Sequence, residues 1–388
     1  MHHTSSSIYL DYMSTTPVDP RVIEVMQRYL GPDSIFGNPS SITHSYGKRA
    51  ASAVEFARAE VAQSVGARSQ DIIFTSGATE SNNLAILGTA ENYRAKGNHL
   101  ITVVTEHKAV LDPMHHLERQ GFKITYLPVQ SDGILDLALL EQAITSDTIL
   151  ASVMHVNNEV GVIQDIAAIG EILHRKGVLL HVDAAQSAGK LAIDLAHLPV
   201  DLMSFSAHKN YGPKGVGALY IRHKPRVRLA PRTFGGGQEQ GLRPGTLPTH
   251  QIAAMGAAFS LSESLREKEQ LEILQMREQL WRGIQDLPHV RLNGHAKNRI
   301  AGNLNVTFSG LDGDSLLMAL HGIAVSSTSA CVSMSHQPSY VLKALGSDDE
   351  DAYSSIRLSM GRFTTQDEIK RVISIIRDAV NQLCKMKP

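Results

Sequence analysis

A lysine that follows an apolar strand is the residue through which this sequence most directly suggests chemistry. Lys209 stands in segment 201–215, where a predicted strand ends in small and polar residues and a turn rich in glycine and proline follows. A lysine held at a strand end beside a pocket can form a Schiff base with a carbonyl group, and the freed amine can then carry a proton. A solvated surface lysine is the alternative, and Lys214 in Gly-Pro-Lys-Gly is locally just as suggestive. Other motifs must therefore decide between the two.

Two further strand ends carry residues that suit a planar, electron-poor ring. Asp183 follows the most apolar predicted strand, and a carboxylate there can keep a pyridine nitrogen protonated. Capping of the next helix would also explain it. His107 in Thr-Glu-His-Lys can stack on a ring and exchange protons near neutral pH, although it is one of 18 histidines.

Small residues mark where the chain can approach an anion or a ligand. In segment 74–83 a strand breaks at Gly77 and a helix begins, so that backbone N–H groups and the Thr79 hydroxyl can cradle a phosphate. Many helices begin in this way, which makes the motif weak by itself. The segments 155–161 and 234–246 also follow strands or are rich in glycine, and an ordinary loop is the alternative for each.

The two cysteines of the chain differ in their surroundings. Cys331 lies in Ser-Ser-Thr-Ser-Ala-Cys-Val-Ser, a polar run without helical or strand periodicity, so we expect an accessible thiol in a mobile loop. Cys384 continues an apolar stripe on the last helix, so we expect a packed, structural thiol. Further along, Arg357 in a predicted short strand can bind a carboxylate in bidentate fashion, with Arg362 as the competitor and a surface ion pair as the alternative.

These residues require a framework of alternating strands and helices to bring them together. Apolar runs rich in β-formers alternate with amphipathic stretches between residues 70 and 222, which predicts an α/β fold with a mostly parallel seven-stranded sheet. Ligands of such sheets bind at the carboxyl ends of the strands. The predicted strands are Asp71–Phe74, His99–Val104, Lys123–Val129, Thr148–His155, Val178–Asp183, Leu202–Ser206 and Val216–Ile221.

The pattern changes after residue 248. A long helical region covers His250–Ile284, strand-like pieces follow at Ile300–Phe308 and Gly322–Val325, and the last helix opens with a capping pair of Thr365 and Glu368. We predict a smaller α+β domain here. The expected division is a large cofactor-binding domain over 16–263, and a small domain of 1–15 and 264–388 that carries the Cys331 loop.

Composition excludes several classes of function. The 388 residues contain 37 Lys and Arg against 38 Asp and Glu, a net charge of −1, which argues against a nucleic-acid surface and against a polybasic membrane anchor. The sequence shows no signal peptide and no apolar run of transmembrane length. Two cysteines are too few for a disulfide framework or a cysteine-rich metal centre, and no histidine pair with helical spacing stands out. We expect a cytoplasmic protein without a metal site.

Taken together, the motifs resemble the cysteine desulfurases, class-V pyridoxal-phosphate enzymes with the type I aminotransferase fold. The resemblance runs from Tyr9-Leu-Asp through Gly37-Asn-Pro-Ser-Ser and every segment above to Gly361-Arg-Phe-Thr. The long serine-rich segment before Cys331 is similar to the first group of that family, the NifS/IscS type.

The resemblance implies a reaction and a set of roles. L-cysteine would be converted to L-alanine, with sulfur passed to Cys331 as a persulfide and then to an acceptor protein such as an iron–sulfur scaffold. Lys209 would form the Schiff base with pyridoxal 5'-phosphate, and His107 would stack on the ring and assist proton transfer. The implied cofactor-binding residues are Ala78, Thr79, His107, Asp183, Gln186, Ser206, His208, Lys209 and Thr246. Asn158 and Arg357 would hold the substrate carboxylate, and Thr246 would reach the phosphate of a neighbouring subunit in a homodimer.

The sequence departs from the family pattern at several positions. Thr328 stands where glycine is usual, Met13 and Ser14 replace small residues, and Gln240 replaces a common arginine. The chain ends at Pro388, where housekeeping members continue into a tail that contacts the scaffold, so a nitrogen-fixation type or specialised role stays open. A selenocysteine lyase, another pyridoxal-phosphate lyase or aminotransferase, and an inactive sulfur-relay or assembly subunit are the alternatives. The retained Lys209 and Cys331 disfavour them.

Overall fold

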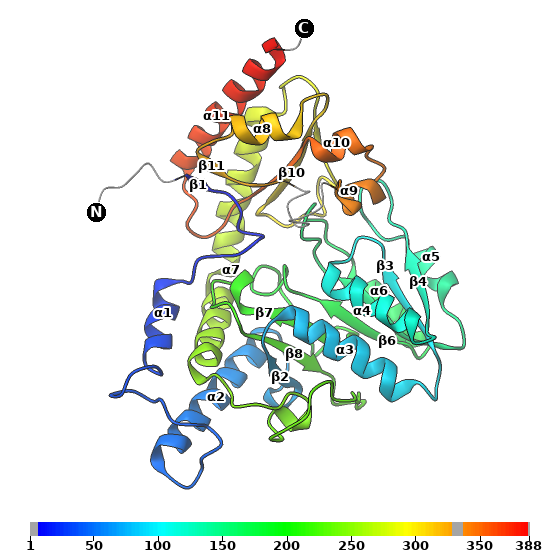
Figure 1. The fold of residues 1–388 in the computed structure, drawn as a ribbon, viewed down its shortest axis with the longest axis vertical. Helices are drawn as coiled ribbons and strands as arrows, with labels where there is room; N and C mark the ends of the chain where they lie inside the picture. The colour runs from blue at the N-terminus through cyan, green and yellow to red at the C-terminus, as the bar shows by residue number, and fades with distance from the viewer. Residues whose placement is uncertain (1–6, 328–336, 387–388) are drawn as a thin grey trace.

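The structure is a computed structural model that describes residues 7–327 and 337–386. Figure 1 shows two layered parts, with a central sheet in the larger one and a smaller group of strands and helices above it. Cys331 and Thr328, to which the sequence analysis drew attention, lie outside the described residues.

The larger part is built on a sheet of seven strands in the order β2-β8-β7-β6-β5-β3-β4. β2 and β7 both pair antiparallel with β8, whereas the other neighbours are parallel, so the expectation of a mostly parallel sheet of seven strands is confirmed. The strands are β2 (Ile72–Thr75), β3 (His99–Val103), β4 (Lys123–Leu127), β5 (Thr148–Met154), β6 (Leu179–Asp183), β7 (Leu202–Ser206) and β8 (Gly217–Ile221).

Helices cover both faces of this sheet because successive side chains of a strand point to opposite sides. On β3, Ile101 belongs to the core shared with α2 and α6, whereas its neighbour Leu100 packs into the core shared with α3 and α4. The helices of this part are α1 (Pro20–Gln27), α2 (Ser45–Ser64), α3 (Ala78–Tyr93), α4 (Lys108–Arg119), α5 (Leu137–Ala143) and α6 (Ile166–Arg175), with the short turns η1 (Ser69–Asp71), η2 (Ala207–Lys209) and η3 (Glu239–Gly241).

The smaller part has its own sheet and its own core. Four antiparallel strands lie in the order β12-β13-β10-β9, and β1 pairs in parallel with β11. The strands are β1 (Ile8–Tyr9), β9 (Val290–Leu292), β10 (Asn303–Phe308), β11 (Ile323–Ala324), β12 (Ser326–Ser327) and β13 (Ser355–Ser359). The helices are α8 (Gly313–Ala319), α9 (Tyr340–Ala344), α10 (Asp349–Tyr353) and α11 (Gln366–Met386).

One long helix joins the two parts. α7 (Thr249–Ile284) packs against α1 and α2 near its start, and its second half contributes to the core that α11 completes (Figure 1). The capping pair expected before α11 is present, since Thr365 N donates to Glu368 Oε2 at 2.8 Å and Glu368 N donates to Thr365 Oγ1 at 3.2 Å. Cys384 packs against the same core, half-buried, as expected.

The sheet topology places the chemically interesting residues at one edge. β2, β3, β5, β6 and β7 all run in the same direction, because two antiparallel pairings through β8 restore the direction of β2. Their carboxyl ends therefore lie side by side, and the loops that follow them carry the motifs found in the sequence.

Candidate active site

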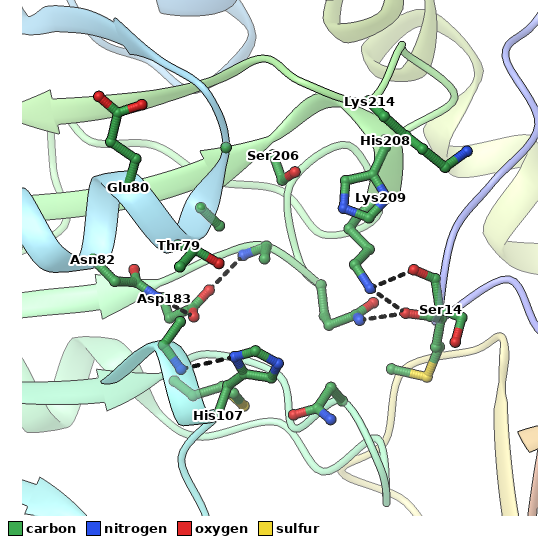
Figure 2. A pocket seen from close by; sticks show the side chains of 18 of the residues that line it. Ser14, Thr79, Glu80, Asn82, His107, Asp183, Ser206, His208, Lys209 and Lys214 are labelled. Atoms are coloured by element: carbon green, nitrogen blue, oxygen red, sulfur yellow. Dashed lines mark hydrogen bonds between the residues drawn. The ribbon is translucent and has the colours of Figure 1, made fainter. Parts of the chain in front are cut away.

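A cavity of about 510 Å³ opens at the carboxyl ends of the strands. Besides the large part, the N-terminal segment at Met13 and Ser14 and Arg357 of β13 contribute to its wall (Figure 2). Ten of the residues expected from the sequence line it: Ala78, Thr79, His107, Asn158, Asp183, Gln186, Ser206, His208, Lys209 and Arg357. Thr246 is exposed and does not line the cavity.

The two candidate lysines differ in their surroundings. Lys209 is half-buried at the end of η2, and its Nζ donates to the carbonyl oxygens of Met13 at 2.6 Å and Ser14 at 2.7 Å (Figure 2). Lys214 also borders the cavity, but its side chain is exposed. An amine held by two carbonyl groups has a defined position at the cavity wall, which favours Lys209 as the reactive lysine.

Asp183 ends β6 and is buried at the cavity wall. Its Oδ2 accepts a hydrogen bond from Asn82 Nδ2 at 2.7 Å, and its Oδ1 accepts from the backbone N–H of Ala185 at 2.9 Å. Sequence reasoning did not single out Asn82. Asn82 is one of three polar side chains that α3 buries, together with Ser81 and Thr89. Both bonds stabilise the ionised carboxylate that a protonated pyridine nitrogen requires.

His107 is the N-cap of α4, where its Nδ1 accepts from the backbone N–H of Ala109 at 3.0 Å. In the neutral ring the proton is therefore on Nε2. Burial lowers the pKa of His107, and Lys209 lowers it further, against the opposing effect of Asp183. The imidazole is thus neutral at neutral pH and offers one N–H donor.

The start of α3 provides the expected cradle for an anion. Gly77 has φ 156° and ψ 176°, a conformation open to glycine alone, and a Cβ at this position would meet no atom within 4 Å. The first N–H groups of the helix, at Ala78 and Thr79, have no intrahelical acceptor. Ser206 borders the same space and is buried. Open volume and free donors at a helix N-terminus fit a phosphate group.

His208 completes this side of the cavity. Its Nδ1 lies 3.1 Å from Thr15 Oγ1. Burial, together with the charges of Lys209, Lys214 and Lys190, lowers the pKa of His208 to about 4. The ring is therefore neutral, and it can donate a hydrogen bond to a phosphate without adding charge.

Arg357 is buried between the two parts of the molecule. Its Nη1 donates to the carbonyl oxygen of Asn158 at 2.7 Å, and its Nη2 donates to Asp11 Oδ1 at 2.7 Å and Ser326 Oγ at 2.9 Å. Its Nε and the Oδ1 of Asn158 are buried without a partner among the described residues. Unsatisfied buried polar atoms are costly, so they point to a ligand that supplies the missing partners. The sequence did not reveal the pairing of Asp11 with Arg357.

Gln186 lines the cavity and makes two hydrogen bonds to other residues of the chain. Its Nε2 donates to the carbonyl oxygen of Met13 at 2.8 Å, and its Oε1 accepts from Lys190 Nζ at 3.2 Å. Lys190 was not singled out from the sequence, because nothing in a loop lysine four residues after Gln186 shows that the fold leaves it only half-exposed.

The sheet, the lysine beside it and the anion cradle define a class-V aminotransferase. The model of the family described as aminotransferase class-V matches residues 8–372. A solved structure of a protein titled "NifS-like protein" superimposes with a TM-score of 0.90 at 36% identity, covering 97% of this chain and 100% of that one.

The similarity extends to a narrower group. A protein of Klebsiella pneumoniae named cysteine desulfurase IscS is 55% identical over 381 residues, which are 98% of this chain and 94% of the relative. A structure titled "SspA in complex with cysteine" matches with a TM-score of 0.82 at 37% identity, covering 92% of this chain and 100% of that one. The chain belongs to the cysteine desulfurase family.

Proposed function

We propose that this protein converts L-cysteine to L-alanine and retains the sulfur as a persulfide on Cys331. The observation that carries the proposal is the grouping of Lys209, Asp183 and Arg357 around one cavity. These residues supply an amine, a carboxylate and a guanidinium group. The family supports the choice of substrate, and the resemblance of the serine-rich segment supports the choice of Cys331, which lies outside the described residues.

Pyridoxal 5'-phosphate is the cofactor that the cavity fits. The open volume at Gly77, together with the donors of Ala78 and Thr79, suits its phosphate, and the Asp183 carboxylate suits its ring nitrogen. Ser206 and His208 would hold the phosphate, and Gln186 would donate to the ring oxygen. When bound, the cofactor acts as an electron sink that makes proton loss from Cα and cleavage of the Cβ–S bond feasible.

Lys209 is the residue that moves the proton. Its Nζ, now held by the carbonyl groups of Met13 and Ser14, would hold the cofactor through its aldehyde group and would serve as the base at the substrate Cα. His107, neutral and with its proton on Nε2, would stack on the ring and donate to the reacting groups. Asp183, positioned by the hydrogen bond from Asn82, would accept the hydrogen bond of the protonated ring nitrogen.

Arg357 and Asn158 would orient the substrate through its carboxylate. The unpartnered Nε of Arg357 is available for one carboxylate oxygen. A substrate anchored in this way presents its thiol away from Arg357, so that the Cys331 thiolate can attack sulfur. The Cβ–S bond then breaks, the S–S bond of the persulfide forms, and alanine leaves after its carbon is protonated.

We further propose a homodimer in which Thr246 reaches the phosphate bound by the partner subunit. Its exposed position outside the cavity supports this. The aromatic side chains of Phe36, Tyr46 and Phe56 are also half or more exposed, and a second copy of the chain would cover them. The persulfide would pass its sulfur to an acceptor such as an iron–sulfur scaffold. The low cysteine content supports a cytoplasmic location.

The domain division at 16–263, with 1–15 and 264–388 as the small domain, is also a proposal. The cores support it, since one cluster joins Ile8 and Leu10 with residues 273–380, whereas the clusters around the large sheet draw on residues 54–259. No helix among the described residues is both long and apolar enough to cross a membrane.

The activity is tested by the alanine that the purified holoenzyme forms from L-cysteine. Lys209→Ala is expected to abolish alanine formation, and Cys331→Ala is expected to abolish persulfide formation, with Cys384→Ala as the matched control that retains both. Mass spectrometry after brief exposure to L-cysteine identifies the thiol that carries sulfur. Persulfide on Cys384 alone, or unchanged activity of Cys331→Ala, would refute the assignment. Parallel assays with selenocysteine and with other amino acids separate the desulfurase from a lyase or an aminotransferase.

A further inference from the structure

Behind the cavity wall lies a lysine that the reaction does not use. Lys190 lies four residues after Gln186, and its Nζ donates to Gln186 Oε1 at 3.2 Å. Lys190 does not line the main cavity, but it borders a second, much smaller one of about 30 Å³ together with Met13, Tyr211 and Glu269. Its contact with the active site therefore passes through Gln186.

The ammonium group of Lys190 and the carboxamide of Gln186 can form this hydrogen bond in only one orientation of the carboxamide. A carboxamide has one end that accepts and one end that donates, whereas a lysine ammonium has three donors and no acceptor. Protonated Lys190 can thus bond only the carbonyl end of Gln186. The amino end must point the other way, where it donates to Met13 O at 2.8 Å. Lys209 Nζ donates to the same carbonyl oxygen at 2.6 Å.

We propose that Lys190 is a positioning residue that holds the carboxamide of Gln186 with its amino group facing the cofactor. This inference rests on the proposed function, in which Gln186 donates to the ring oxygen of pyridoxal phosphate. Without Lys190 only the Met13 carbonyl oxygen fixes the orientation of the carboxamide. A rotation by half a turn then becomes easier and would bring the carbonyl oxygen of Gln186 to face the ring oxygen. Two acceptors in contact repel each other, so the cofactor would be held less tightly.

The surroundings of Lys190 support a role beyond structure. Burial, together with the charges of Lys209 and Arg357, lowers the pKa of Lys190 to about 7. Glu269 lines the same small cavity, but its carboxylate is paired with Arg362 at 2.5 Å. His208, the other titratable group whose pKa Lys190 affects, is neutral. Among the described residues no carboxylate forms an ion pair with Lys190, and the carbonyl end of Gln186 is its hydrogen-bond partner.

The proposal is tested with Lys190→Met, which keeps the length of the side chain but removes its donors. Lys176→Met is the matched control, since Lys176 is exposed and makes the same change in charge. The readouts are the dissociation rate constant of bound pyridoxal phosphate and its visible absorption spectrum between pH 6 and 9, both without substrate. We expect Lys190→Met to raise the dissociation rate about tenfold, the effect typical of losing the partner that orients a ligating residue. The difference from wild type should be largest below pH 7, where the ammonium is fully protonated.

A double-mutant cycle shows whether Lys190 acts through Gln186. In a Gln186→Leu background, Lys190→Met is expected to have no further effect on the dissociation rate. Equal effects in both backgrounds, or an unchanged rate in Lys190→Met, would overturn the proposal.

Gln186→Glu provides a second test if Lys190→Met does not fold. The carboxylate keeps an acceptor for Lys190 but has no donor for the cofactor, so it too should release the cofactor about tenfold faster. A wild-type rate in Gln186→Glu would equally contradict the proposal. Failure of the proposed function is distinguishable, because the wild-type protein would then show no absorption band from the bound cofactor and no alanine formation.

Discussion

At the scale of single residues, the site is controlled by what each side chain touches rather than by its type. Lys209 and Lys214 are chemically identical and five residues apart, yet only Lys209 is held by two carbonyl groups at the cavity wall. Asp183 is likewise prepared for its role by Asn82. The surroundings of a side chain also control the pKa of carboxyl groups that the proposed reaction does not use, as at Glu159.

Glu159 is expected to make stability depend on pH. Burial raises the pKa of this carboxyl from 4.5 to about 7, with the Ser339 hydrogen bond and Arg357 opposing the shift. Since the folded-state pKa is raised, the contribution of Glu159 to stability is fully present below pH 4.5 and is lost as the pH rises through about 7. We expect wild type to lose roughly 2 kcal/mol relative to Glu159→Gln between pH 5 and pH 8.

The measurement is urea unfolding of both proteins at the two pH values. Glu267→Gln, an exposed glutamate, is the control that should leave the pH dependence unchanged. A constant difference between wild type and Glu159→Gln from pH 5 to pH 8 would contradict the prediction.

At the scale of elements, the connection between β2 and α3 most directly shapes the site. The backbone of β8 comes so close to this turn that a Cβ on Gly217 would lie 2.6 Å from the Cα of Gly77. A buried ion pair braces the region from the other side, since both carboxylate oxygens of Glu239 accept from Arg58 at 2.7 Å and Oε2 also accepts from Phe74 N at 2.6 Å. The position of the anion cradle therefore depends on three elements.

Gly77→Ala tests the cradle directly. The substitution forces alanine into a conformation that costs about 1–3 kcal/mol and puts a methyl group into the volume proposed for the phosphate. We expect a lower free energy of unfolding by about that amount and a weaker affinity for pyridoxal phosphate, measured by urea unfolding of the apoprotein and by equilibrium binding. Gly31→Ala, which meets no atom within 4 Å and has ordinary backbone angles, should change neither. Unchanged cofactor affinity in Gly77→Ala would place the phosphate elsewhere.

At the scale of the whole molecule, the site is assembled from segments far apart in the sequence. Arg357 of the small part reaches the cavity of the large part and binds Asp11 and Asn158 there. The proposed dimer extends this assembly to a second chain, because Thr246 lies outside the cavity of its own subunit.

A heterodimer of two defective variants shows whether Thr246 acts in the site of the neighbouring subunit or in the site of its own subunit. Thr246→Ala should weaken cofactor binding about tenfold, as expected for losing a hydrogen bond to a charged group, and Lys209→Ala should be inactive. In a heterodimer of the two, the subunit that keeps Lys209 receives the intact Thr246 of the other. We expect that subunit to bind cofactor with wild-type affinity, measured by titration of heterodimers purified with two different tags. Affinity that stays weakened would show that Thr246 acts within its own chain, and a monomer in light scattering would refute the dimer.

Much of this protein follows from local sequence. The alternation of apolar runs and helical patterns predicted all seven strands of the main sheet, the long helix after residue 248 and the capped last helix, because hydrophobic periodicity is a local property. The residues expected at the site lie at strand ends, and the direction of parallel strands brings strand ends together. The residues that the sequence analysis missed depend instead on contacts that form only in the folded chain. Asn82 bonds a partner 101 positions away, and Asp11 bonds one 346 positions away. Lys190 bonds a residue only 4 positions away, but its surroundings come from distant segments of the chain.

Only the tertiary structure decided which lysine is held at the cavity, which carboxylate has a prepared partner, and which cation is buried. The physical reason is that burial and hydrogen-bond partners belong to the packed chain. An ammonium group in a loop is solvated unless another segment packs against it. No sequence pattern around Lys190 indicates that the N-terminal segment at Met13 and the middle of α7 do so.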